Sequence, residues 1–129
     1  MVRMDLLDKV VSLEESASEF GFRWGTADQI MHQIQSECEE VKEHLHHGLS
    51  QDNKAALQEE IGDLLHAVFS LCVFSGFSPG VTLGQSLTKF ERRLHAVKLV
   101  AEERGLANLD GKPFDELMYI WDRAKELVS

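Results

Sequence analysis

The residues of this chain best suited to chemistry are two pairs of acidic residues. Glu37 and Glu40 form the first pair, in the run SECEEV, and Glu60 and Asp63 form the second, in EEIGDLL. Residues three apart on an α-helix share one face, so each pair directs two carboxylates the same way. Carboxylates gathered where water is scarce either take up protons or hold a hard cation such as Mg²⁺. The spacing favours a metal site, with solvated helix surface as the alternative for each pair.

Helical periodicity places both pairs beside apolar faces. At about 100° per residue, Glu37 falls at the edge of an apolar stripe and Glu40 lies just beyond it. Glu39 and Glu43 of the same segment point the other way. The second pair aligns with a row of residues that becomes wholly apolar one helical turn later. Both pairs are therefore expected to border a cleft.

Cationic and aromatic residues with helical spacing follow later in the chain. Lys89 and Arg93 lie one turn apart beside a Leu-Phe stripe and are suited to grip a polyphosphate, whereas Arg92 projects elsewhere. Trp121 and Lys125 are likewise four residues apart, which places an aromatic ring and a cation together. The alternatives are a solvated basic helix edge and a tryptophan that belongs to the core.

Five amphipathic helices are expected to position these residues. Apolar spacing and turn residues predict helices over about 6–20, 26–48, 57–74, 82–105 and 113–128, with a polar link LSQDN before the third. Capping boxes are expected at Thr26-x-x-Gln29 and Thr82-x-x-Gln85. The second half of the third helix is apolar nearly all round, so this helix should be central. No alternating strand pattern occurs, and the prediction is an all-α bundle of four to five helices.

Length, charge and cysteine usage limit the class of protein. A chain of 129 residues predicts one domain over 1–129 that buries a core without covalent cross-links. The two cysteines lie in apolar surroundings and should be reduced, as in a cytoplasmic protein. No signal peptide or membrane span is expected. A formal charge of −9 argues against binding nucleic acid through a basic surface, but not against a nucleotide with a metal ion.

The histidines offer a rival interpretation of the acids. Glu43-x-x-His46 and Asp63-x-x-His66 match the spacing used in di-iron helical bundles. Such a site needs inward-facing glutamates on two further helices, and Glu43 is predicted to face outward. The histidines around His46 crowd a helix end, where cations are favoured by the helix dipole. A di-iron site is the weaker interpretation.

Taken together, the motifs resemble the MazG-like nucleoside triphosphate pyrophosphohydrolases of the all-α pyrophosphatase superfamily. The runs FGFRWGTADQI, SECEEV, EEIGDLLHAVFSL, KFERRLHAV, ERGL and YIWDRAK occur in that family's order and cover nearly the whole chain. The resemblance implies cleavage of the α–β phosphoanhydride of a nucleotide, giving a monophosphate and pyrophosphate. It also implies Mg²⁺, with Mn²⁺ as a substitute, and a homodimer or homotetramer. The implied metal ligands and catalytic acids are Glu37, Glu40, Glu60 and Asp63, and the implied substrate contacts are Lys89, Arg93, Trp121 and Lys125.

Two positions depart from the family's pattern. The family signature usually begins Glu-Glu-x-x-Glu, which the run EEVKE fits literally, but core-facing geometry favours the register with Ser36 in place of the first Glu. Leu87 stands where family members often carry Asn. Leu87 leaves open a second function, a catalytically weak nucleotide-sensing or helical interaction module with the same fold.

Overall fold

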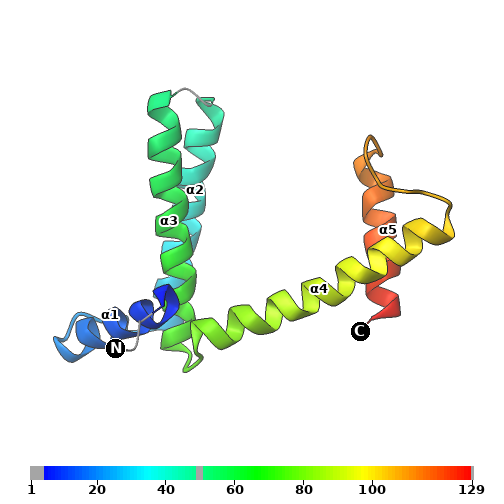
Figure 1. Ribbon diagram of the computed structural model, residues 1–129. Helices are drawn as coiled ribbons and strands as arrows, with labels where there is room; N and C mark the ends of the chain where they lie inside the picture. Colours follow the sequence, from blue (N-terminus) through cyan, green and yellow to red (C-terminus); the bar gives the residue numbers. More distant parts are fainter. Residues whose placement is uncertain (1–4, 49–50, 129) are drawn as a thin grey trace. The chain divides into compact units, whose positions relative to one another are not determined.

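A computed structural model describes residues 5–48 and 51–128 of the chain. Their regular structure is helical throughout, which confirms the expected all-α class (Figure 1). The helices are α1 (Leu6–Glu19), α2 (Ala27–His46), α3 (Gln51–Phe74), α4 (Pro79–Glu103) and α5 (Phe114–Leu127). The chain divides into two compact units between Thr82 and Leu83. That residues 1–129 form a single domain stays a prediction.

The start of α2 is determined by local hydrogen bonds. The Gln29 backbone N–H donates to Thr26 Oγ1 at 3.2 Å, and the Thr26 backbone N–H donates to Gln29 Oε1 at 3.1 Å. The same Gln29 oxygen accepts from the Gly25 N–H at 2.7 Å. This is the expected capping box, and it satisfies backbone donors that the first helical turn leaves without partners.

Thr26→Ala is expected to lower the free energy of unfolding by about 1 kcal/mol, because it removes the acceptor for the Gln29 N–H. Urea denaturation followed by circular dichroism measures the change. Thr82→Ala is the matched control: Thr82 lies inside α4 and should tolerate alanine without loss of stability. Equal destabilisation by the two substitutions would contradict this assignment of the cap.

The second expected capping box is wrong. Helix α4 begins at Pro79, so Thr82 already lies within the helix. The cap comes from Ser78, whose Oγ accepts from the Val81 N–H at 3.2 Å. Proline suits the first helical position because its fixed φ is already helical and it has no N–H to leave unpaired. A serine followed by proline therefore starts the helix one turn before the Thr-x-x-Gln pattern.

Two other helix starts differ in detail. Helix α3 begins at Gln51, inside the expected link LSQDN, of which residues 49–50 lie outside the described residues. Pro113 is the residue before α5 rather than its first residue, and it makes no side-chain capping bond. The ends of α1 and α4 are as expected, since Gly21 (φ 96°) and Gly105 (φ 73°) follow them with positive φ.

Helix α3 is the central helix of the first unit. It packs along α2 and also contacts α1, and α2 and α3 lie side by side in Figure 1. Ile30, Leu57 and Ala67 are buried in this unit. Both cysteines are free and half-buried. The expectation that the apolar third helix is central is confirmed within this unit.

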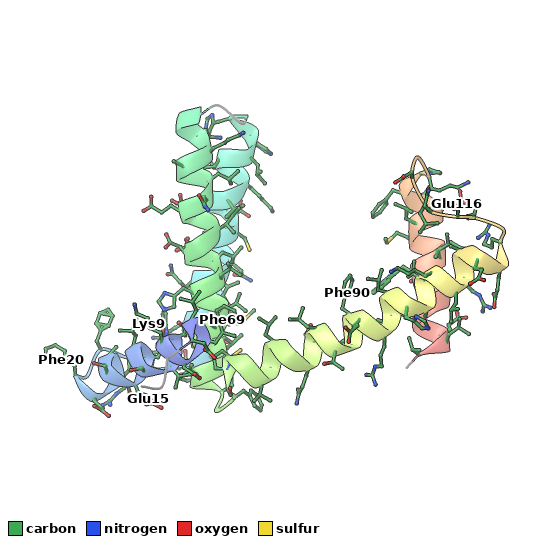
Figure 2. All side chains as sticks on the ribbon, viewed as in Figure 1. Lys9, Glu15, Phe20, Phe69, Phe90 and Glu116 are labelled. Atoms are coloured by element: carbon green, nitrogen blue, oxygen red, sulfur yellow. The ribbon has the colours of Figure 1, made fainter. Side chains whose placement is uncertain are left out.

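The apolar stripe of α1 is less buried than its periodicity predicts. Leu6, Leu13 and Phe20 are exposed in the described chain, Phe20 by 91% (Figure 2). Among the described helices, α1 contacts α3. A carboxylate anchors this contact: Glu14 Oε1 accepts from Ser70 Oγ at 2.5 Å and lies 2.8 Å from His66 Nε2. Homo-oligomerisation, which would cover exposed apolar surface, stays a prediction.

The second unit has its own small core. The C-terminal half of α4 and one face of α5 supply its buried residues, which are Ala96, Val100, Ala101, Ile120 and Ala124. All five are small or β-branched, so the side chains that surround them can approach closely. This core holds the segments that carry Arg93 and Trp121.

Among the described residues, no single helix has both the length and the apolar character needed to cross a membrane. One bent pair, Asn53–Phe74 with Pro79–Glu103, meets the two criteria jointly, by length and composition alone.

Candidate functional site

Three of the four predicted acidic ligands converge between α2 and α3. Carboxylate oxygens of Glu37, Glu60 and Asp63 lie within 4.8 Å of one another. Glu37 and Glu60 are half-buried, and Asp63 is exposed. The two helices run past each other, so residues far apart in sequence supply one cluster. All donors in this cluster are oxygens, which suits Mg²⁺.

The fourth predicted ligand, Glu40, belongs to a second and overlapping cluster. Glu40, His44 and Glu60 bring two carboxylate oxygens and one imidazole nitrogen within 4.8 Å of one another. Glu60 is shared by both clusters. The sequence interpretation assigned the histidines of this segment to the helix dipole and missed His44. The spacing of Glu40 and His44, four residues apart on one helical face, is the signal that would have found it.

The electrostatics of the clusters centre on Glu60. Partial burial raises the pKa of its carboxyl above the ordinary value, and the neighbouring charges of Glu40, Glu37 and Asp63 raise it further. The neighbouring His44 lowers this pKa. The folded protein therefore holds negative charge at Glu60 at a cost, which a bound cation would offset.

Local contacts distinguish the two possible registers of the first acidic motif. Gln33 Nε2 donates to Glu37 Oε1 at 2.7 Å, which orients this carboxylate. Glu39 instead forms an exposed ion pair with Lys42 at 3.4 Å. Neither Glu39 nor Glu43 belongs to either cluster. The geometry favours the register that uses Glu37 and Glu40, with Ser36 exposed beside them.

The di-iron interpretation finds no support in the described residues. His66 lies 2.8 Å from Glu14 of α1 and not in a cluster with Asp63. His46 is exposed and belongs to neither cluster. The Glu-x-x-His spacing is therefore incidental here.

In the second unit, Arg93 of α4 and Trp121 of α5 come together. The guanidinium carbon of Arg93 lies 5.7 Å from the centre of the Trp121 ring, within the range of a cation–π contact. Phe90, labelled in Figure 2, packs near the same ring at 6.1 Å. Arg93 Nε is buried and has no hydrogen-bond partner in the described part of the chain. A planar cation held against a ring has a fixed orientation, which suits bidentate contact with an anion such as a phosphate.

The other predicted substrate contacts are more open. Lys89 and Arg92 are exposed, and Leu87 is exposed by 58%. Lys125 lies 3.6 Å from Asp122 on the same helix and does not form a ring contact with Trp121. The acidic clusters and the Arg93–Trp121 pair belong to different units of the chain. The roles expected for all eight residues stay predictions.

Comparison with known proteins identifies a family. Residues 25–98 match the family model described as the MazG nucleotide pyrophosphohydrolase domain, which is more than half of the chain. The matched range contains the acids of both clusters together with Lys89 and Arg93. Trp121 and Lys125 lie beyond it.

Curated relatives agree with this match. The chain is 31% identical over 113 residues to a nucleoside triphosphate pyrophosphohydrolase/pyrophosphatase MazG of Thermotoga maritima, covering 88% of this chain and 41% of that protein. It is 27% identical over 119 residues to a nucleoside triphosphate pyrophosphohydrolase of Escherichia coli (strain K12), covering 92% and 44%. The chain thus spans less than half the length of these relatives.

Proposed function

Because this chain belongs to the MazG nucleotide pyrophosphohydrolase family, we propose that it hydrolyses nucleoside triphosphates at the α–β phosphoanhydride, giving a monophosphate and pyrophosphate. The convergence of Glu37, Glu60 and Asp63 within 4.8 Å carries this proposal. The relatives from Thermotoga maritima and Escherichia coli are named for the same class of reaction. A cytoplasmic location and a homodimer or homotetramer remain predictions that accompany it.

The donor chemistry of the first cluster fits Mg²⁺. Glu37, Glu60 and Asp63 offer oxygens only. Burial and then the neighbouring carboxylates raise the pKa of Glu60, and a divalent cation would neutralise the charge of these carboxylates. Glu40 adds a fourth carboxylate next to Glu60. When bound there, Mg²⁺ would neutralise phosphate oxygens and lower the pKa of a water molecule.

Residues of the chain accept the proton, bind the triphosphate and contact the nucleotide. One carboxylate of the clusters accepts the proton of the attacking water, as a general base within hydrogen-bonding reach. Arg93, with Lys89 one turn away on α4, binds the triphosphate and stabilises charge that develops on the leaving pyrophosphate. Trp121 offers an aromatic face for the nucleotide, and Lys125 a second cation on α5.

A second function is favoured by Leu87. An exposed leucine has no donor or acceptor for a phosphate or a base, and it stands where family members often carry Asn. Ser36 likewise stands where the family signature usually has a glutamate. A catalytically weak module that binds a nucleotide without rapid turnover is the alternative.

Product analysis separates the two functions. The purified chain is incubated with a panel of ribo- and deoxyribonucleoside triphosphates and Mg²⁺, and the products are resolved by anion-exchange chromatography. Monophosphate and pyrophosphate in equal amounts support the proposal, whereas diphosphate and phosphate would place cleavage at the wrong bond. Nucleotide binding by calorimetry without turnover supports the sensing module. Neither binding nor turnover contradicts both.

A further inference from the structure

His44 gives the second cluster a donor set that differs from the first. Its members Glu40, His44 and Glu60 combine one nitrogen with carboxylate oxygens, whereas the first cluster offers oxygens alone. Oxygen-only sites suit Mg²⁺, whereas an imidazole nitrogen is a ligand that transition metals accept more readily than Mg²⁺ does. The overlapping clusters should therefore differ in the cation that each prefers.

The hydrogen bonding of His44 prepares its ring as a ligand. Nδ1 lies 2.8 Å from the backbone carbonyl oxygen of Glu40. A carbonyl only accepts, so Nδ1 carries the proton, and in the neutral ring the lone pair lies on Nε2. A backbone carbonyl that binds one ring nitrogen and leaves the other for the metal is the usual arrangement of ligating histidines.

The helical turn that carries His44 is tied to α3. Asn53 Nδ2 donates to the His44 carbonyl oxygen at 2.7 Å and also to the carbonyl oxygen of Gly48. These bonds connect the last turn of α2 to the first turns of α3, the helix that carries Glu60. Half-buried His44 is thus held beside Glu60 rather than left free in solvent.

We propose that Glu40, His44 and Glu60 form a second cation position, which accepts a transition metal such as Mn²⁺ more readily than Mg²⁺, next to the oxygen-only position of Glu37, Glu60 and Asp63. Glu60 would contribute to both positions. This inference rests on the proposed function for the presence of the first position, and it adds a nitrogen ligand that separates the two.

Pulsed electron paramagnetic resonance of the full chain with Mn²⁺ tests this directly. Nitrogen hyperfine modulation on the Mn²⁺ signal is expected in the wild type and should disappear in His44→Leu. His46→Leu is the matched control, because His46 is exposed on the same helix end and belongs to neither cluster. It should retain the modulation. Absence of modulation in the wild type, or its persistence in His44→Leu, would overturn the inference.

Metal affinity provides the second readout. His44→Leu should weaken Mn²⁺ binding roughly tenfold or more, on the scale of disturbed metal ligation, and should change Mg²⁺ binding much less. Equal weakening of both ions overturns the inference. Pyrophosphate release by the wild type with Mg²⁺, measured in parallel, keeps the two proposals apart. If pyrophosphate is released but the Mn²⁺ signal shows no nitrogen modulation, the His44 site is contradicted and the proposed reaction stands. If the modulation is present but no pyrophosphate is released, the proposed reaction is contradicted and the His44 site stands.

Discussion

Glu60→Gln is expected to lower nucleotide hydrolysis by about 100-fold or more, the scale on which loss of one key electrostatic contact lowers turnover. Glu60 is the residue common to both clusters, so the substitution removes one carboxylate from each. Glutamine keeps the size of the side chain but not its charge. Pyrophosphate release at saturating nucleotide and Mg²⁺ measures the effect.

The same substitution should not destabilise the metal-free protein. The raised pKa of Glu60 means that the folded state holds this charge against burial and the charges of Glu40, Glu37 and Asp63. Removing the charge relieves these costs, so in chelator the variant should melt at or above the wild-type temperature. With Mg²⁺ the order should reverse, because a ligand stabilises only the folded protein that binds it.

The pH dependence of this difference has a defined sign. A folded-state pKa above the unfolded value means that the folded state binds the proton more readily, so wild-type stability in chelator rises as pH falls through the raised pKa. The advantage of Glu60→Gln should therefore be present at neutral pH and fade toward pH values below the ordinary carboxyl range. Melting curves in chelator across this range measure it.

Glu59→Gln is the control for all three measurements. Glu59 is the adjacent residue on α3, is exposed and belongs to neither cluster. It should leave turnover and Mg²⁺-dependent stabilisation close to wild type. If Glu59→Gln matched Glu60→Gln in loss of turnover, the assignment of the acidic face of α3 would be wrong.

Arg93→Ala is expected to lower kcat/KM by about 100-fold or more, because Arg93 supplies charge stabilisation for the phosphates. Its guanidinium lies 5.7 Å from the Trp121 ring centre, and its buried Nε has no protein partner in the described residues. Mg²⁺ binding, measured by calorimetry, should remain nearly intact, since Arg93 is not a member of the acidic clusters. Arg93→Lys should also fail to restore full activity, because an ammonium lacks the planar set of donors.

Arg92→Ala is the matched control for the phosphate contact. Arg92 is the exposed neighbour on the same helix, so its removal should change kcat/KM much less. Lys89→Ala, one turn from Arg93, should lower kcat/KM strongly, as Arg93→Ala does. If Arg92→Ala were the most damaging of the three, either the assigned face of α4 or the proposed role of Arg93 would be wrong. A melting curve of each variant separates loss of function from loss of fold.

Local patterns in the sequence were sufficient for the helices and for the choice of candidate acidic residues. The apolar period identified all five helices, and the choice of Glu37 and Glu40 over Glu39 and Glu43 followed from helix phase alone. The Thr26 capping box was also predictable, because its partners lie within one turn. These features depend on interactions between residues close in sequence, which hydrophobic spacing and side-chain chemistry report directly.

Tertiary structure decided the features that depend on which helix faces meet. The pairing of α2 with α3 brings His44 of one helix to Glu60 of the other, and no local pattern contains that distance. The contact of Arg93 with Trp121 likewise joins two helices. The raised pKa of Glu60 follows from its partial burial and from charges on both α2 and α3. Charge and ligand geometry act through space over a few ångströms, so the sequence determined which residues share a helix face, and only the packing of the helices determined their burial and their partners.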